Sequence, residues 1–481
     1  MLTDGLLTLP YAALDAHLAS LESFFTSRGV SPGAVVALEC ANTVTGALSL
    51  LSLLSRGYSV VLLPHPGAAS PRPEVPRVCR HRVTVRSQLA SGTDVSLEHP
   101  ESFLTVEEVP GHHVPGGAEA WATGHLLLRT SGSIGTPKLA LYTHERLLAN
   151  ALAALPRLRL TGEDRVLLPV PLAHMFGLGA GFLPGFTVGA SLDFVEGANL
   201  LRCLEHERTF RPSVAFMTPA LCTMMLRGRS VPEHYRHVVV AGDKLKPESF
   251  PSVEARFRRV VNLYGTTEQG VIAAADAEVA DGPRATTVGA PLEGVALRLE
   301  PPESAGELPG DAGSLLCRHP HGFEGYVAGD GGPWTGEPPL RDGWYRTRDL
   351  GRLHPGGLLE VLGREDHSVN RDGRLVLLAD IERAMETLPD VERAVTVLGG
   401  EHLRGRHILA FCTPREGRGL DGAAVRAACA SVLPPYALPD EVRVLPTLPQ
   451  LPNGKVDRRA LTALATVAET PNASDDKECQ P

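Results

Sequence analysis

The sequence lacks the features that mark several large classes of protein. Its 481 residues include 8 cysteines but no CxxC pair, so we expect neither a zinc site nor a disulfide framework, and a reducing cytoplasm fits this usage. Lysine and arginine form no basic block and the net charge is −9, so the sequence shows none of the clustered positive charge that binds a nucleic acid. The amino terminus has an acid and no basic region, so we expect no secretory signal.

Long apolar runs are also missing. The most apolar window, residues 46–64, is broken by Arg56 and Gly57, which predicts a helix followed by a buried strand rather than a membrane span. The apolar content of 43% is ordinary for a globular protein, while the length exceeds that of one hydrophobic core. We therefore expect two or three domains.

The clearest chemical pattern is a Gly-, Ser- and Thr-rich stretch that follows an apolar strand. Leucines at 126–128 predict the strand, and the sequence TSGSIGTPK follows it. Glycines allow the backbone to bare its N–H groups, while the hydroxyls and Lys138 add donors and a positive charge that suit a phosphate chain. Pro137 separates the last glycine from the lysine, so this is not a Walker A loop, and a plain surface loop is the alternative. The candidate phosphate-binding residues are Thr130, Ser131, Gly132, Ser133, Gly135, Thr136 and Lys138.

A second apolar strand runs into the sequence YGTTE. Tyr264 offers a flat face for a purine, and Gly265 allows the backbone to approach a ligand closely. Thr266 and Thr267 are candidate nucleotide contacts, the latter as a donor to an α-phosphate. Glu268 is a hard oxygen ligand suited to Mg²⁺. Taken alone, the sequence could be an ordinary turn.

In this order the two motifs resemble the signatures of the adenylate-forming superfamily, which includes acyl- and aryl-CoA ligases, adenylation domains of peptide synthetases and luciferases. The resemblance covers about residues 10–465. It implies an α/β core of residues 1–364 with a small β-barrel-like subdomain, a mobile α+β lid domain of residues 365–465, and a disordered tail at 466–481. Alternating strand and helix patterns from residue 34 to residue 63 independently predict a parallel α/β layer.

Three later motifs fit the same resemblance and imply further site residues. In WYRTRDLG, Asp349 would accept the ribose hydroxyls, although Arg348 replaces the usual glycine. In GRED, Arg364 would approach ribose or phosphate and Asp366 would be the hinge. In PNGK, Lys455 would bridge the substrate carboxylate and the α-phosphate. Each is an ordinary solvated side chain when considered alone, and their shared order favours the functional interpretation.

The resemblance also implies a pocket for the acid. In the loop PLAHMFGLG, His174 is expected to line the pocket rather than act as a general base, although a packed core histidine is the usual alternative. The other expected pocket residues are Phe176, Met217, Gly242 and Gly265. The loop holds no aspartate to bind an α-amino group, so we expect an aryl acid or a short to medium acyl acid.

The implied reaction uses ATP and Mg²⁺, with Lys455, Glu268 and Lys138 as catalytic residues, and passes the acyl group to CoA or to the phosphopantetheine of a separate carrier protein. The segment 368–382 departs from the superfamily pattern QVKxxGxRIELGEIE, since its inner lysine, arginine and glutamate are replaced. This departure puts thiol transfer in question more than adenylation. An amide synthetase and a non-catalytic nucleotide-binding homologue stay open as alternatives, the second disfavoured because Lys455 is present.

Overall fold

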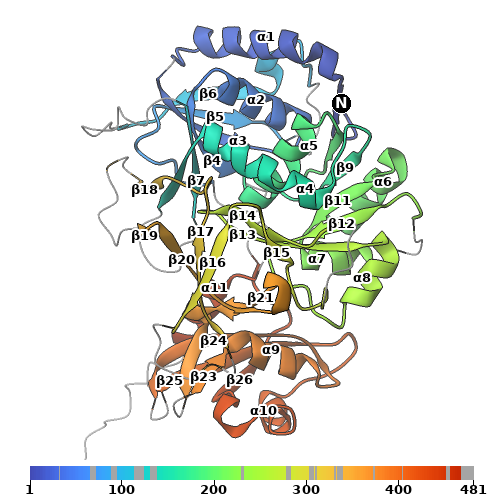
Figure 1. Cartoon of the computed structure of the whole chain (residues 1–481), viewed down its shortest axis with the longest axis vertical. Coiled ribbons are helices and arrows are strands. Elements are labelled where there is room, and N and C mark those ends of the chain that lie inside the picture. Colours follow the sequence, from blue (N-terminus) through green and yellow to red (C-terminus); the bar gives the residue numbers. More distant parts are fainter. Residues whose placement is uncertain are drawn as a thin grey trace, which may run out of the picture. The chain divides into compact units, whose positions relative to one another are not determined.

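The computed structural model describes the chain from residue 1 to residue 466 with internal gaps. The residues outside the description are 32, 66–71, 88–94, 113–123, 131–137, 229–231, 278–282, 303–307, 309–310, 330–331, 333–339, 372–373, 403–404, 451–455 and 467–481, together with the side chains of 401, 402 and 405. Figure 1 labels many of the elements, which are numbered in chain order.

The chain forms two compact units. Unit 1 comprises Met1–Arg298, Leu316–Thr347 and Leu353–Glu360, and unit 2 comprises Leu299–Leu315, Arg348–Arg352 and Val361–Pro481. The expected boundary between a core ending at residue 364 and a lid beginning at residue 365 stays a prediction.

Unit 1 contains a seven-stranded sheet whose central strands are parallel. Its order is β18-β8-β7-β4-β3-β5-β6. The pairs β3–β4, β3–β5 and β4–β7 are parallel, whereas β7–β8, β8–β18 and β5–β6 are antiparallel. The strands are β3 (Val35–Cys40), β4 (Ser59–Pro64), β5 (His81–Val85), β6 (Leu104–Glu108), β7 (His125–Arg129), β8 (Leu139–Thr143) and β18 (Gly325–Val327).

A nine-stranded sheet is the second layer of unit 1. Its order is β15-β14-β13-β12-β11-β9-β10-β1-β2, and the run from β13 to β1 is parallel throughout. The strands are β1 (Leu2–Thr3), β2 (Thr8–Leu9), β9 (Arg165–Leu168), β10 (Ser191–Phe194), β11 (Val214–Met217), β12 (His237–Val240), β13 (Val260–Thr266), β14 (Gly270–Ala274) and β15 (Ala290–Pro291). The α/β class expected from the sequence is confirmed.

Some helices of unit 1 begin at a side chain that accepts a hydrogen bond from the backbone of the first turn. Thr143 accepts from the backbone N–H of Arg146 and Thr218 accepts from that of Leu221, so both threonines are N-caps. The helices are η1 (Tyr11–Ala13), α1 (Leu14–Ser27), α2 (Val44–Ser55), η2 (Pro100–Ser102), α3 (His144–Ala153), α4 (Leu155–Leu158), η4 (Phe176–Phe182), α5 (Leu183–Thr187), α6 (Leu200–Phe210), α7 (Pro219–Met225), α8 (Phe250–Phe257) and η5 (Pro355–Gly357).

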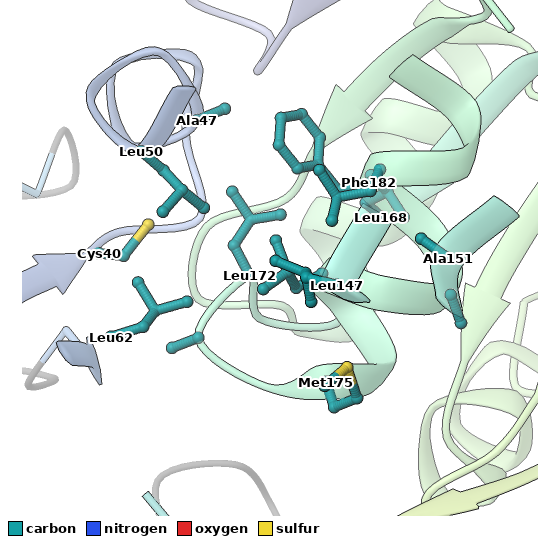
Figure 2. Packing of buried hydrophobic residues seen from close by; sticks show 14 of the residues in the cluster. Cys40, Ala47, Leu50, Leu62, Leu147, Ala151, Leu168, Leu172, Met175 and Phe182 are labelled. Atoms are coloured by element: carbon teal, nitrogen blue, oxygen red, sulfur yellow. The ribbon is translucent and has the colours of Figure 1, made fainter. Parts of the chain in front are cut away.

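The largest hydrophobic cluster joins the two sheets of unit 1. Figure 2 shows Ala47 and Leu50 of α2 on one side of this cluster and Phe182 on the other, with Leu172 and Leu147 among them. Helix α2 is buried on nearly every face, because its sequence is apolar or small throughout. The sheets are therefore held by a shared core, which fixes the strand ends that carry the candidate site.

One expectation about local structure was wrong. The segment after His174 was expected to be an apolar loop, but Phe176–Phe182 forms a π-helix. A Cβ atom on Gly177 would lie 2.2 Å from the carbonyl oxygen of Pro171. The glycines thus let this short helix approach its neighbours closely, and the gain in buried contacts outweighs their poor helix propensity.

The remaining elements form a small sheet and an α+β region. A five-stranded sheet, which contains residues of both units, has the order β16-β17-β20-β19 with β21 beside β20. Its strands are β16 (Ala296–Glu300), β17 (Gly313–Arg318), β19 (Leu340–Arg341), β20 (Trp344–Leu353) and β21 (Leu359–Arg364). Unit 2 adds η6 (Glu365–His367), β22 (Ser368–Arg371), β23 (Arg374–Leu377), α9 (Leu378–Glu386), β24 (Val391–His402), β25 (Gly405–Pro414), α10 (Gly422–Cys429), η7 (Pro435–Ala437), β26 (Glu441–Val444) and α11 (Arg458–Thr466).

Among the described residues, none of the helices combines the length and the apolar character that crossing a membrane requires.

Candidate functional site

A predicted pocket residue and a predicted nucleotide-binding residue lie at one edge of the nine-stranded sheet. Val240 of β12 is in register with Met217 of β11 on one side and with Asn262 of β13 on the other. The carboxyl ends of these strands therefore meet at one edge, where ligands bind in open α/β sheets. Gly242 and Tyr264 lie just beyond those registered residues, so the fold brings them to the same edge.

The base of the predicted phosphate loop is a closed hairpin between β7 and β8. Arg129 pairs with Leu139, and the backbone N–H of Thr130 donates to the carbonyl oxygen of Lys138 at 3.1 Å. The Thr130 hydroxyl reaches the same oxygen at 3.3 Å. The two ends of the loop are thus held together at Thr130 and Lys138. Ser131, Gly132, Ser133, Gly135 and Thr136 lie outside the described residues.

Glu268 and Lys138 meet around one aromatic side chain. The hydroxyl of Tyr326 donates to Oε1 of Glu268 at 2.7 Å, and the ammonium of Lys138 lies 4.3 Å from the centroid of the Tyr326 ring. The hydroxyls of Tyr326 and Tyr345 are 3.1 Å apart. A predicted metal ligand and a predicted phosphate ligand, 130 residues apart in sequence, are therefore close in space.

Burial keeps two phenols near Glu268, those of Tyr345 and Tyr142, in their protonated form. Desolvation, followed by the negative charge of Glu268, raises the pKa of Tyr345 well above its ordinary value. The same two causes raise the pKa of Tyr142, whose hydroxyl donates to the carbonyl oxygen of Thr267 at 2.9 Å. Both phenols thus remain hydrogen-bond donors at any physiological pH.

The turn after Glu268 is clamped by a buried asparagine. Asn150 donates to the carbonyl oxygen of Gln269 at 2.8 Å and accepts from the N–H of Val271 at 3.1 Å. Gly270 between them has φ +63°, and a Cβ atom there would lie 2.0 Å from the Asn150 amide oxygen. His319 bonds to the Val271 carbonyl oxygen, and burial lowers its pKa to about 4, so it stays neutral. The clamp fixes the backbone that carries Glu268.

The residues around Glu268 fit a magnesium ion that is shared with a nucleotide. Within the described ranges there is no group of three or more His, Cys, Asp and Glu side chains that could hold a metal ion by itself. Mg²⁺ typically takes one or two carboxylates and completes its shell with phosphate oxygens and water. A half-buried carboxylate beside a lysine at the end of a phosphate loop supplies the protein's part of such a shell.

The predicted acid-pocket residues do not all face the same way. Phe176 packs against the central cluster, and its ring centroid is 5.9 Å from that of Phe216. Met217, the next residue in β11, is fully buried in a different hydrophobic cluster from that of Phe216. Side chains alternate along a strand, so Phe216 rather than Met217 neighbours Phe176. His174 is half-buried, and its carbonyl oxygen accepts from the N–H of Leu178 in the π-helix.

Unit 2 carries the predicted ribose ligand and hinge. Arg364 donates a two-pronged pair of hydrogen bonds to Asp366, at 3.0 and 3.1 Å, and its Nε lies 3.9 Å from Asp349. Burial acts to raise the pKa of Asp366, but the hydrogen bond and charge of Arg364 outweigh it and lower that pKa. Arg348 has φ +63°, a conformation that favours glycine, which the superfamily pattern has at this position.

Lys455 lies outside the described residues, but the residues on either side of 451–455 are anchored within unit 2. Gln450 and Val456 form an antiparallel bridge. Arg458 donates to both carboxylate oxygens of Glu382 at 2.9 Å. Glu382 lies in α9, so the ion pair joins Arg458 of α11 to α9.

Sequence reasoning missed four residues near Glu268: Tyr326, Tyr345, Tyr142 and Asn150. Tyr326 lies in a strand of three residues, too short for an alternation of apolar and polar residues to be visible. Tyr345 stands within the WYRTRDLG motif, and its position beside the predicted ribose ligand was the one available signal. Their contact with Glu268 depends on long-range strand pairing that no local pattern contains.

Comparison with known proteins identifies two family models along the chain. The model described as AMP-binding enzyme matches residues 2–327, and the model described as AMP-binding enzyme C-terminal domain matches residues 380–455. The first model alone covers more than half of the chain.

Curated relatives and solved structures resemble the chain over most of its length. It is 30% identical to the probable non-canonical nonribosomal peptide synthetase CymA of Salinispora arenicola over 95% of this chain, but it spans only 6% of that protein's length. It is 29% identical to the indoleacetate–CoA ligase of Aromatoleum aromaticum, with 82% of this chain and 79% of that protein covered. A crystal structure of ATP-bound MatB from Rhodopseudomonas palustris matches with a TM-score of 0.76 and 21% identity, covering 98% of this chain and 96% of that one.

Proposed function

The chain belongs to the family of AMP-binding enzymes, and from that premise we propose that it activates a carboxylic acid with ATP. The products of the first step are an acyl-AMP and pyrophosphate. The acyl group then passes to a thiol, either that of CoA or that of a phosphopantetheine on a separate carrier protein. The enzyme is thus an AMP-forming acid–thiol ligase.

The observation that carries the proposal is the convergence of Lys138 and Glu268 on Tyr326. A carboxylate is a poor acyl donor, because its leaving group would be oxide. Attack on the α-phosphate of ATP exchanges that group for AMP and builds negative charge on the phosphates. Catalysis therefore needs fixed cations and donors rather than a strong base.

We assign each candidate residue a role in that chemistry. Lys138 and the hydroxyls of its loop hold the β- and γ-phosphates, and Tyr264 stacks on adenine. Asp349 accepts from the ribose hydroxyls, and Arg364 contacts ribose or phosphate. The other proposed nucleotide contacts are Thr130, Ser131, Gly132, Ser133, Gly135, Thr136, Gly265, Thr266 and Thr267.

Glu268 would hold Mg²⁺, which when bound neutralises charge on the phosphates. Lys455 flanks the α-phosphate and the acid carboxylate as they join. We propose that Asp366 is the hinge of a lid domain of residues 365–465, whose movement withdraws Lys455 after adenylation. The core domain would then be residues 1–364.

The acid is proposed to be aryl or short to medium acyl, without an α-amino group. The segment around His174 has no carboxylate to bind an ammonium, and the ring pair of Phe176 and Phe216 offers an apolar wall. The indoleacetate–CoA ligase, by its name, acts on such an acid. Gly242 and Gly265 would leave room for the substrate beside the nucleotide.

A second candidate, transfer of the acyl group to an amine, is favoured by one feature of unit 2. Leu375 and Leu377 form a buried cluster with Leu350 at positions where the superfamily pattern has charged residues. The surface that serves thiol transfer in the superfamily is therefore changed in this chain. Amide formation needs the same acyl-AMP but a different acceptor.

The test is ATP–pyrophosphate exchange across a panel of carboxylic acids, followed by addition of CoA, a phosphopantetheine-bearing carrier or a simple amine. We expect exchange with at least one aryl or acyl acid lacking an α-amino group, and thioester formation with one thiol. Exchange with α-amino acids alone would contradict the proposed acid class. An amide product without any thioester would replace thiol transfer with the second candidate.

A further inference from the structure

The segment 323–327 connects the two charged residues of the candidate site through its backbone. In β18, Tyr326 pairs with Ala140, so the segment lies against β8, the strand that begins just after Lys138. At its other end, the N–H of Phe323 donates to the carbonyl oxygen of Glu268 at 2.8 Å. One short segment is thus attached to the exit of the phosphate loop and to the turn that carries the carboxylate.

The ring of Tyr326 is held in place by other aromatic side chains. Phe323 meets it nearly edge to face, with centroids 4.9 Å apart and an interplanar angle of 71°. Phe323 meets the Tyr345 ring in the same way at 5.4 Å, and the two phenol oxygens are 3.1 Å apart. Such contacts restrict the rotation of a side chain and fix the direction of its hydroxyl.

We propose that Tyr326 is a positioning residue that sets the Glu268 carboxylate for a divalent cation and the Lys138 ammonium for phosphate. The inference rests on the proposed function. The hydroxyl of Tyr326 donates a hydrogen bond to Oε1 of Glu268 through its single proton. This bond fixes the plane of the carboxylate and so the directions of its remaining lone pairs. Partners behind a metal-binding carboxylate tune its affinity for the metal in this way.

The aromatic face of Tyr326 performs the second part of the role. Lysine has a flexible four-carbon side chain, and its ammonium is attracted to the electron-rich face of an aromatic ring. With Nζ 4.3 Å from the Tyr326 centroid, Lys138 is ordered before a nucleotide arrives. The hydroxyl and the ring therefore serve different ligands, and substitutions can separate the two.

The experiment compares Tyr326→Phe and Tyr326→Leu with the unchanged enzyme by calorimetric titration of ATP, with Mg²⁺ present and with Mg²⁺ removed by a chelator. Tyr326→Phe keeps an aromatic face but removes the proton donor. We expect it to weaken binding of ATP in the presence of Mg²⁺ by about tenfold, as for loss of a hydrogen bond to a charged group, and to leave metal-free ATP binding unchanged. Tyr326→Leu should weaken both.

Tyr235→Phe is the matched control. Tyr235 is also buried and its hydroxyl donates to a carboxylate oxygen, Oε2 of Glu207, at 3.0 Å, within a different cluster of unit 1. This control should lower the melting temperature while leaving the ratio of the two ATP affinities at its original value. The Mg²⁺ concentration that gives half-maximal pyrophosphate exchange should rise in Tyr326→Phe and stay constant in the control.

The possible outcomes separate this inference from the proposed function. If the unchanged enzyme binds ATP with Mg²⁺ but Tyr326→Phe keeps the same Mg²⁺ dependence, Tyr326 has only a structural role and the inference is overturned. If the unchanged enzyme binds no ATP under either condition, the proposed function itself fails. If Tyr326→Leu does not fold, Tyr326→Phe alone decides the question of the carboxylate.

Discussion

The surroundings of Glu268 and the hairpin 368–377 differ sharply in character. Around Glu268 the side chains are polar or aromatic, and two phenols lie beside its carboxylate. In the hairpin, Leu375 and Leu377 are buried with Leu350. When the superfamily pattern is aligned on Gly373 and Glu382, it has an arginine at the position of Leu375 and a glutamate at the position of Leu377.

The polar surroundings of Glu268 and the apolar packing of the hairpin suit different steps of the reaction. Adenylate formation needs charged groups at fixed places around a nucleotide, and the chain retains them. The hairpin has buried leucines where the superfamily pattern has charged residues. It therefore contributes to the stability of unit 2 rather than to a polar surface. The following experiments test this contrast.

The largest expected effect is on adenylation, from Lys455→Ala. Removing a charge-assisted contact to the α-phosphate should slow pyrophosphate exchange by about a hundredfold, equivalent to about 3 kcal/mol of activation free energy. ATP affinity, measured by calorimetry, should change little, because the contact forms mainly in the transition state. Exchange at the original rate in this variant would remove Lys455 from the mechanism.

A substitution in the hairpin should lower stability without slowing adenylation. Leu375→Ala creates a cavity in the cluster with Leu350 and Leu377, and should lower the free energy of unfolding of unit 2 by about 2–3 kcal/mol. Pyrophosphate exchange by the folded enzyme should be unchanged. Leu375→Met, which conserves volume, is the control and should cost less than about 1.5 kcal/mol. Equal denaturation midpoints for the two variants would show that the leucine is not packed as described.

The clamp on the Glu268 turn should affect both stability and metal dependence. Asn150→Ala leaves the buried N–H of Val271 and the Gln269 carbonyl without their partner and should cost about 2 kcal/mol of stability. It should also raise the Mg²⁺ concentration needed for half-maximal exchange. Asn262→Ala, which removes hydrogen bonds to the carbonyl oxygens of Arg284 and Thr287, is the control and should alter stability alone. Equal Mg²⁺ requirements in the two variants would contradict the role of the clamp.

The smallest expected effect is the pH dependence of the ion pair between Arg364 and Asp366. Arg364 lowers the pKa of Asp366 in the folded state, so the pair stabilises the fold above the ordinary pKa of an aspartate, and this contribution is lost as the pH falls through the lowered value. Asp366→Asn should therefore lower the free energy of unfolding at pH 7 by less than about 1 kcal/mol, because Arg364 is partly exposed. The difference from the unchanged protein should vanish in acid. A difference that grows on acidification would contradict the assigned direction.

Much of the fold could be predicted because its signals are local. The buried strand around Leu127 and the helix capped by Thr143 depend on apolar runs and capping residues that the sequence displays directly. The π-helix at 176–182 could not be predicted in this way. Its glycines have low helix propensity, and only the close packing against Pro171 explains the conformation.

The candidate site also has residues that local patterns predict and residues that they do not. Glu268 and Lys138 were predicted from motifs, because a carboxylate after YGTT and a lysine after a Gly-rich stretch can be recognised in the sequence alone. The contact of Tyr326 with Glu268 could not be predicted, because strand β18 lies against β8, a pairing of segments about 185 residues apart. The assignment of Met217 to the pocket stays a prediction, and the contact of its neighbour Phe216 with Phe176 could not be read from the sequence.

The most direct measurement is identification of the nucleotide product formed when the enzyme is mixed with ATP, Mg²⁺ and a cognate acid and quenched within one turnover. Attack on the α-phosphate predicts acyl-AMP and pyrophosphate in equal amounts, detected by mass spectrometry, with formation slowed about a hundredfold in Glu268→Gln. Formation of ADP with an acyl phosphate, or acyl-AMP at an unchanged rate in Glu268→Gln, would contradict the account.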